Sequence, residues 1–190
     1  MISEITNQKR NSSHMKTVKL TLGILVIVIA FAFTLVQSTN WKIKEDAYSI
    51  TFKGSKVDGT IKGVKAKILF DEDNPGKSKI LASIDVNTLN TGNSLMNKHA
   101  KSESGLDSKV FPFINFESIL ISGKSDNYNA KGKLTIKGIT KEISLPFTIQ
   151  NKGTEAVFIG KLSIVPKDYN ITRFGTPDLL EIGLTIPVTK

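Results

Sequence analysis

The stretch "KGKLTIKGITKEISLPFTI" (residues 131–149) alternates apolar and polar residues on both sides of a central glycine, Gly138. The apolar residues fall on every second position: Leu134 and Ile136 before the glycine, then Ile143, Leu145, Phe147 and Ile149. A period of two is typical of a β-strand with one buried face, and a glycine between two such runs indicates a turn. The stretch therefore predicts two strands, each with one apolar face.

The same alternation recurs along the chain after residue 40. Further strands are predicted at 48–54, 57–70, 79–86, 113–122, 156–165 and 179–188. Turns rich in Asp, Asn, Gly and Pro separate several of them, as in "DEDNPGK" (71–77) and "GKSDNYN" (123–129). Gly59 and Gly63 indicate that the long strand over 57–70 coils or bulges.

About eight strands of this kind, several longer than the usual ~3–10 residues, favour a closed antiparallel barrel. Closure also removes the exposed edges that an open sheet would present. A barrel of about eight strands either fills its interior with side chains or holds one small ligand, and the pattern leaves both open. The candidate inward-facing residues are Phe52, Ile68, Phe70, Ile84, Phe116, Leu134, Ile136, Phe147, Phe158, Leu162 and Ile164.

One polar stretch, "NTGNSLMNKHAKSESGLDSKVFPF" (90–113), interrupts the strand pattern. It predicts a short helical insertion at 94–104 that covers one mouth of the barrel. Three roles are open for His99, in this order: a hydrogen bond that fixes the loop, a contact with a ligand headgroup, and catalysis.

Catalytic and metal chemistry are weakly supported. A Ser-His-Asp triad drawn from Ser102 or Ser104, His99 and Asp107 would lie on one short surface segment without the glycines of a nucleophile elbow. The absence of cysteine excludes thiol nucleophiles, and a metal site needs several convergent ligands, whereas the domain has one histidine. The sequence therefore predicts no enzyme, no metal and no cofactor.

The formal net charge of +9 comes from scattered lysines, and Arg173 is the single arginine after residue 40. Nucleic-acid sites favour arginine and stacked aromatic residues, so nucleic acid is not an expected partner. A mildly basic surface suits an anionic membrane or a phosphorylated ligand better. Arg173 itself is a surface residue, a loop residue paired with Asp178, or a contact for a headgroup phosphate at the barrel mouth.

The N-terminal stretch "LTLGILVIVIAFAFTLV" (20–36) carries no charge. At ~1.5 Å per residue it spans about 26 Å as a helix, close to the ~30 Å core of a bilayer. Basic residues in 1–19 would keep the start of the chain in the cytoplasm. The stretch is therefore a membrane anchor or a cleaved signal peptide, followed by a linker (37–40) and an outward-facing domain (41–190) that is tethered to the cell envelope or secreted.

Three blocks carry a resemblance to a known family. They are "NTGNSLMNKHAKSESGLDSKVFPFINFES" (90–118), "KGKLTIKGITKEISLP" (131–146) and "FIGKLSIVPKDYNI" (158–171). In this order they resemble the YceI-like family of lipocalin-like barrels, which bind lipids such as polyisoprenoids in the bacterial envelope. The resemblance runs from Trp41 to the C-terminus. Loop positions that depart from the family's pattern are Met96, Asn97, Gly105, Val165, Pro166 and Asn170.

The resemblance implies a hydrophobic tunnel through the barrel, filled by an isoprenoid or fatty-acyl chain. The protein would then be a carrier, buffer or sensor of that lipid. The residues expected at the lid or the headgroup are Leu95, Met96, His99, Leu106 and Arg173. A filled structural or interaction barrel and an envelope enzyme are the alternatives, and the oligomeric state is open, with a dimer as one option.

Overall fold

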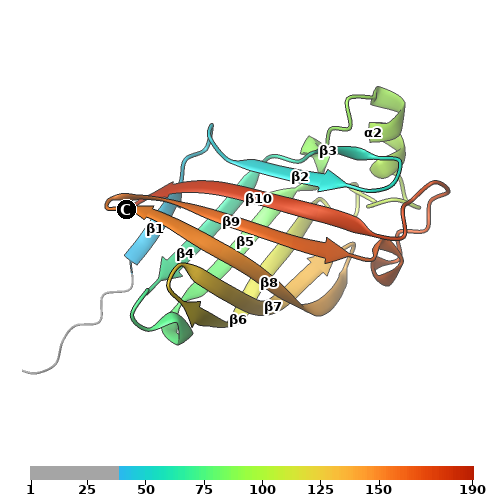
Figure 1. Cartoon of the computed structure of the whole chain (residues 1–190). Helices are drawn as coiled ribbons and strands as arrows, with labels where there is room; N and C mark the ends of the chain where they lie inside the picture. The colour runs from blue at the N-terminus through green and yellow to red at the C-terminus, as the bar shows by residue number, and fades with distance from the viewer. Residues whose placement is uncertain (1–38) are drawn as a thin grey trace, which may run out of the picture. The chain divides into compact units, whose positions relative to one another are not determined.

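Ten β-strands make up most of residues 39–190, the part of the chain that the computed structural model describes (Figure 1). The strands are β1 (Thr39–Ile43), β2 (Ser49–Lys53), β3 (Asp58–Thr60), β4 (Val64–Phe70), β5 (Lys79–Asp85), β6 (Phe113–Lys124), β7 (Asn127–Ile136), β8 (Ile139–Lys152), β9 (Glu155–Ile164) and β10 (Leu180–Thr189). The connections hold the short helix α2 (Ser94–Ala100) and the 3₁₀ turns η2 (Pro75–Lys77), η3 (Val86–Thr88) and η4 (Pro166–Tyr169). This confirms the predicted all-β class with a short helical insertion.

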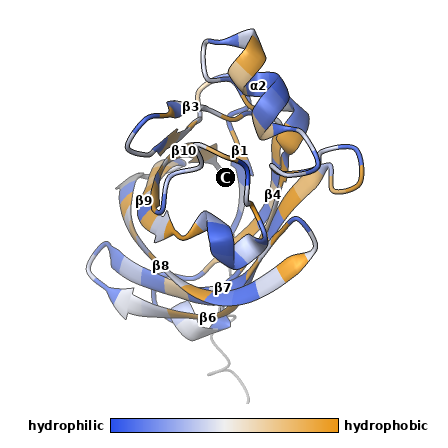
Figure 2. Ribbon diagram, turned by 90° about the vertical axis from the view of Figure 1, so that its right-hand side faces the viewer, coloured by the Kyte–Doolittle hydropathy of each residue, from blue (hydrophilic) through white to orange (hydrophobic). Residues whose placement is uncertain are grey.

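Antiparallel pairing joins the strands in the order β1-β4-β5-β6-β7-β8-β9-β10. β10 also pairs with β1, where Ile43 lies opposite Val188, and this pairing closes the sheet into a barrel. β2 pairs with the same edge of β10 further along. With β1 and β2 counted together and β3 outside the ring, eight strand positions surround the interior, as predicted. Figure 2 looks along the barrel and shows the strands as a ring.

The hairpin of β7 and β8 follows directly from the 131–149 pattern. Ile136 lies opposite Ile139, so only Lys137 and Gly138 form the turn. Both have positive φ, 50° and 75°, which matches the two-residue turns whose twist suits an antiparallel hairpin. A Cβ atom on Gly138 would lie 2.7 Å from the ring of Phe111, so glycine is needed here for space as well as for conformation.

The turn predicted at 123–129 is much shorter in the structure. Lys124 lies opposite Asn127, and Ser125 and Asp126 alone make the turn, with φ of 53° and 65°. The prediction was too long because polar residues at a strand end look like turn residues in the sequence. They are the exposed ends of β6 and β7.

The prediction of a single strand over 57–70 is also wrong. The chain breaks into β3 and β4, and Gly63 in the break has a φ of +67°. β3 pairs with β2, whereas β4 pairs with β1 and β5, so the two parts belong to different neighbours. β1 itself, which closes the barrel, was missed because only two of its residues, Trp41 and Ile43, are apolar, and no third apolar residue extends the alternation.

The predicted membrane-spanning or signal helix at 20–36 lies outside the described residues, as does the basic segment 1–19. The described residues 39–190 belong to one compact unit. Among residues 39–190, no helix combines the length and the apolar character that crossing a membrane requires.

Candidate functional site

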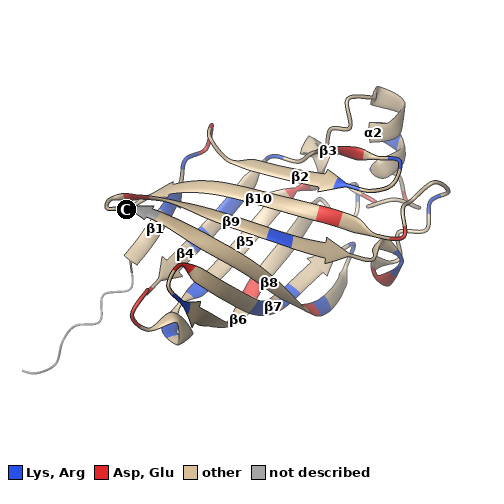
Figure 3. Ribbon diagram, in the orientation of Figure 1, with Lys and Arg blue, Asp and Glu red and all other residues tan. Residues whose placement is uncertain are grey.

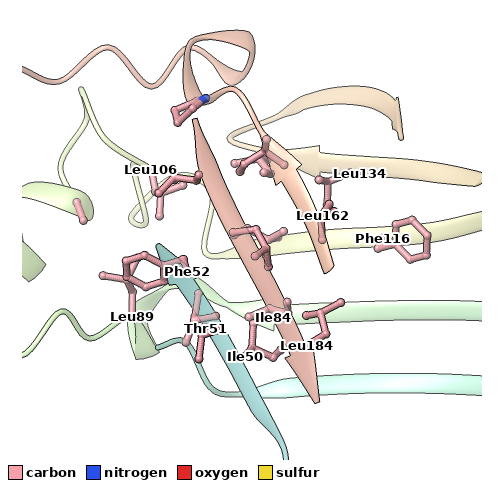
Figure 4. Close-up of a pocket in the computed structure, with 18 of the residues that line it drawn as sticks. Ile50, Thr51, Phe52, Ile84, Leu89, Leu106, Phe116, Leu134, Leu162 and Leu184 are labelled. Carbon is pink, nitrogen blue, oxygen red and sulfur yellow. The ribbon is translucent and has the colours of Figure 1, made fainter. Parts of the chain in front are cut away.

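The barrel encloses an apolar cavity of about 460 Å³. Figure 4 shows part of its lining. The volume lies within the ~300–1,000 Å³ typical of small-molecule sites. Its walls come from alternate residues of nearly all the barrel strands, because every second side chain of a strand points to the same face. The lining is almost entirely aliphatic and aromatic, so the space suits a hydrocarbon chain.

The structure brings together all but one of the predicted inward-facing residues. Those that line the cavity are Phe52, Ile68, Ile84, Phe116, Leu134, Ile136, Phe147, Phe158, Leu162 and Ile164. Phe70 does not reach it. This last residue of β4 is buried beyond the cavity, with its ring centroid 5.7 Å from that of Phe158 and 4.9 Å from that of Tyr128. Whether the lining residues bind a ligand stays a prediction.

Several lining residues were missed by the sequence reasoning. β10 contributes Ile182, Leu184 and Ile186, and β8 contributes Ile143 and Leu145. Their alternation was visible, so the signal to include them was present. Leu89 and Ile171, in connections without a period, offered no such signal.

One end of the cavity, called the floor from here on, is closed by aromatic rings. It lies toward the end of the barrel that carries the C-terminus and the start of β1 (Figure 1). Phe147 and Phe158 stack with ring centroids 5.9 Å apart and line the cavity from below. Behind them Trp41, Phe70 and Tyr128 complete one buried cluster.

The other end, called the mouth, lies beneath α2 and the loop 171–179 (Figure 1). Asn93 caps the start of α2, and its Oδ1 accepts hydrogen bonds from the backbone N–H groups of Leu95 and Met96, both at 3.0 Å. Asn97 Oδ1 accepts from the Thr91 N–H at 2.7 Å. These amide contacts hold the helix over the mouth.

Four of the five predicted mouth residues line the cavity: Met96, His99, Leu106 and Arg173. Leu95 does not, because its side chain is 59% exposed on the outer side of α2. Their roles as lid or headgroup contacts stay predictions.

His99 does not fix the loop in the way that was expected first. Its imidazole makes no hydrogen bond with any residue in the described range 39–190, and only its main-chain oxygen is used, accepting from Ser102 Oγ at 2.7 Å. The loop is held instead by backbone contacts, such as Leu106 N–H to Ala100 O at 2.8 Å. The imidazole therefore remains available at the mouth.

The groups considered for a triad are not assembled. Ser102 Oγ bonds to the main chain of His99 and lies 3.4 Å from Ser104 Oγ, so neither hydroxyl is paired with the imidazole. Within residues 39–190, no three His, Asp or Glu side chains converge as a metal site would require.

Arg173 is not paired with Asp178, so this one of the readings left open by the sequence is wrong. Asp178 instead accepts from Lys167 Nζ at 2.9 Å, and this contact holds the pKa of Asp178 below and the pKa of Lys167 above the ordinary value. The backbone N–H of Arg173 donates to Ser104 O at 3.0 Å, which places the residue beside the insertion.

The charged residues of the lining are all basic. Arg173 and Lys56 are present, and the described part of the lining contains no aspartate or glutamate. Elsewhere basic and acidic residues are interspersed along the strands (Figure 3). The mouth therefore offers positive charge to whatever occupies it.

The comparison with known families decides the relationship: residues 41–189 match the model of the YceI-like domain. The chain belongs to the YceI-like family. A curated relative, Protein YceI of Salmonella newport (strain SL254), is 30% identical over 155 residues, which cover 78% of each chain. The resemblance seen in the three sequence blocks is thus confirmed.

Solved structures show the same YceI-like fold. BcnA of Burkholderia cenocepacia superposes with a TM-score of 0.73 at 23% identity, covering 78% of this chain and 100% of that one. A polyisoprenoid binding domain from Saccharophagus degradans, implicated in plant cell wall breakdown, superposes with a TM-score of 0.58 at 12% identity, covering 78% and 97%. At these identities the likeness concerns the fold.

Proposed function

We propose that this protein binds a lipid non-covalently, with an isoprenoid or fatty-acyl chain in the barrel and the headgroup at the mouth. The apolar cavity of about 460 Å³ is the observation that carries the proposal. Membership of the YceI-like family and the description of the Saccharophagus degradans domain as polyisoprenoid binding support it.

The size of the hydrophobic effect makes such binding feasible. Burial of each methylene stabilises a complex by about 0.8 kcal/mol, so ten methylenes contribute about 8 kcal/mol. That is the free energy of a complex with a Kd of about 1 μM, before the entropic cost of association is subtracted. A chain can therefore be retained without any polar contact, and polar groups at the mouth would add selectivity.

The charges at the mouth favour an anionic headgroup. Arg173 and Lys56 line this end, and His99 beside them presents an imidazole that can donate a hydrogen bond. A phosphate or carboxylate would complement them, because charge-assisted hydrogen bonds to arginine are stronger than neutral ones.

The proposed setting is the cell envelope, where a tethered or secreted barrel would act as a carrier, buffer or sensor of the lipid. The support for it is the apolar stretch 20–36 of the sequence. A filled structural barrel is less favoured, since the interior is not filled by side chains. Catalysis is less favoured because Ser102 and His99 are not paired through the imidazole.

Two probes with the same hydrocarbon chain test the proposal: radiolabelled palmitic acid and hexadecanol. The delipidated full-length chain should retain both, and the acid more tightly. Arg173→Gln should weaken retention of the acid by roughly tenfold, the loss of one charge-assisted contact of ~1.5 kcal/mol, and leave the alcohol unchanged. The matched control is Lys161→Gln. Lys161 lies on the outer surface of β9, where it forms an ion pair with Glu181. A protein that retains neither palmitic acid nor hexadecanol would contradict the proposal.

A further inference from the structure

The floor of the cavity consists of aromatic rings that brace one another. Phe158 contacts Trp41 edge to face, with ring centroids 6.3 Å apart, and Phe70 at 5.7 Å in a perpendicular arrangement. Phe147 stacks on Phe158 at 5.9 Å and on Tyr128 at 5.5 Å. Offset stacks and edge-to-face pairs at these distances are the favoured aromatic geometries. The floor is therefore a layer of tightly packed aromatic rings.

The floor is also covered on the side that faces away from the cavity. Trp41 is buried, and Lys190 Nζ lies over its ring, 4.9 Å from the centroid. Val188 and Ala130 in the same cluster are fully buried. A chain that reaches Phe147 and Phe158 from the mouth thus has no route through this end of the barrel.

Near the floor, the walls carry two small side chains. Ala66 and Ala82 lie opposite each other on β4 and β5, one level above the pair Ile68 and Ile80, and all four line the cavity. Ala66 also packs against the buried cluster that contains the rings of the floor. Because Ala66 and Ala82 are small, a hydrocarbon chain has room down to the rings of Phe147 and Phe158. The packed rings leave no room for it beyond them.

The depth available to a chain can be taken from β10. Leu180 lines the cavity near the mouth, and Ile186 lines it near the floor. Six residues at ~3.3 Å each, on a strand tilted by roughly 40°, give about 15 Å along the barrel axis. This depth limits how much of a hydrocarbon chain can be buried.

We propose that Phe147 and Phe158 act as a ruler, fixing the length of hydrocarbon chain that the barrel buries in full. The inference rests on the proposed function and adds chain-length selectivity to it. Affinity should rise roughly fourfold with each methylene until the end of the chain meets the rings. Beyond that length the affinity should stop rising, because the excess methylenes stay at the mouth and move the carboxylate away from Arg173.

A series of radiolabelled straight-chain fatty acids from eight to twenty-two carbons tests the ruler on the delipidated full-length protein. The readout is the chain length at which affinity stops rising. Phe158→Ala removes part of the floor and should shift that length upward by at least two carbons. Ala66→Leu raises the floor and should shift it downward, and it tests the proposal even where Phe158→Ala does not fold. Phe113→Ala, on the outside of β6, is the control and should shift nothing.

The outcomes separate the two claims. Opposite shifts in Phe158→Ala and Ala66→Leu would establish the ruler. A wild-type protein that retains fatty acids, with the same levelling length in both variants, would overturn the ruler and leave lipid binding intact. A wild-type protein that retains no chain of any length would overturn the proposed function itself, and the ruler with it.

Discussion

At the scale of single residues, the face of the strand decides whether a side chain meets the cavity or water. On β6, Phe116 lines the cavity, while Phe113, three positions earlier, is 51% exposed. The odd spacing puts the two rings on opposite faces of the same strand. The pair therefore separates an effect on the cavity from an effect on the strand.

Phe116→Asp should abolish retention of palmitic acid and of hexadecanol, because it puts a carboxylate without a partner into an apolar space. It should also lower the free energy of unfolding by several kcal/mol unless the carboxyl stays protonated. Phe113→Asp places the same charge on the outside and should change the stability by less than about 1 kcal/mol, with binding kept. Retention measurements and urea unfolding of both variants check this, and equal loss of binding in the two would contradict it.

Alternation in the sequence was enough to place residues such as Leu134 and Phe158 inside the barrel. It could not give their depth, and for that reason Phe70 was expected in the cavity but lies behind the floor. The alternation could not predict which polar side chains pair with one another either. Asp178 pairs with Lys167 and not Arg173, a choice made by the fold of the loop after η4.

At the scale of elements, α2 and the loop 171–179 together border the mouth of the cavity, with α2 at its rim (Figure 2). The helix is only seven residues long and depends on its cap at Asn93 and on the Asn97–Thr91 contact. Met96 points to the cavity, whereas its neighbour Leu95 points to water. If α2 is a lid, these two residues should behave differently.

Met96→Ser should speed the dissociation of bound palmitic acid several-fold, because it removes about 1–2 kcal/mol of apolar contact at the mouth. Leu95→Ser removes a similar side chain from the outer face and should leave the dissociation rate unchanged. Stopped-flow transfer of a fluorescent fatty acid to acceptor vesicles measures both rates. Equal rates in wild type and Met96→Ser would show that α2 does not act as a lid.

The sequence predicted the existence of most elements but not where one strand gives way to the next. In the 57–70 stretch the apolar residues change from odd to even positions at Gly63, a shift that a bulge within one strand would also produce. The break there depends on β3 and β4 having different partners. Turn lengths likewise depend on register, which no local pattern of polar residues contains.

At the scale of the whole molecule, closure between β1 and β10 is what converts a curved sheet into a container. The aromatic floor and the basic mouth lie at opposite ends of that container, joined by the apolar walls of the strands between them. An amphiphile with a hydrocarbon tail and an anionic head has the same division. The lipid binding that we propose rests on this correspondence.

Native mass spectrometry of the full-length chain, purified in mild detergent from the cells that produce it, tests the proposed lipid binding most directly. We expect a species heavier than the chain by the mass of one lipid, lost on denaturation and identified as an isoprenoid or fatty-acyl compound by organic extraction. Phe116→Asp should show only the mass of the bare chain. A wild-type protein that carries no lipid and takes up no polyprenol, quinone or fatty acid afterwards would contradict the account.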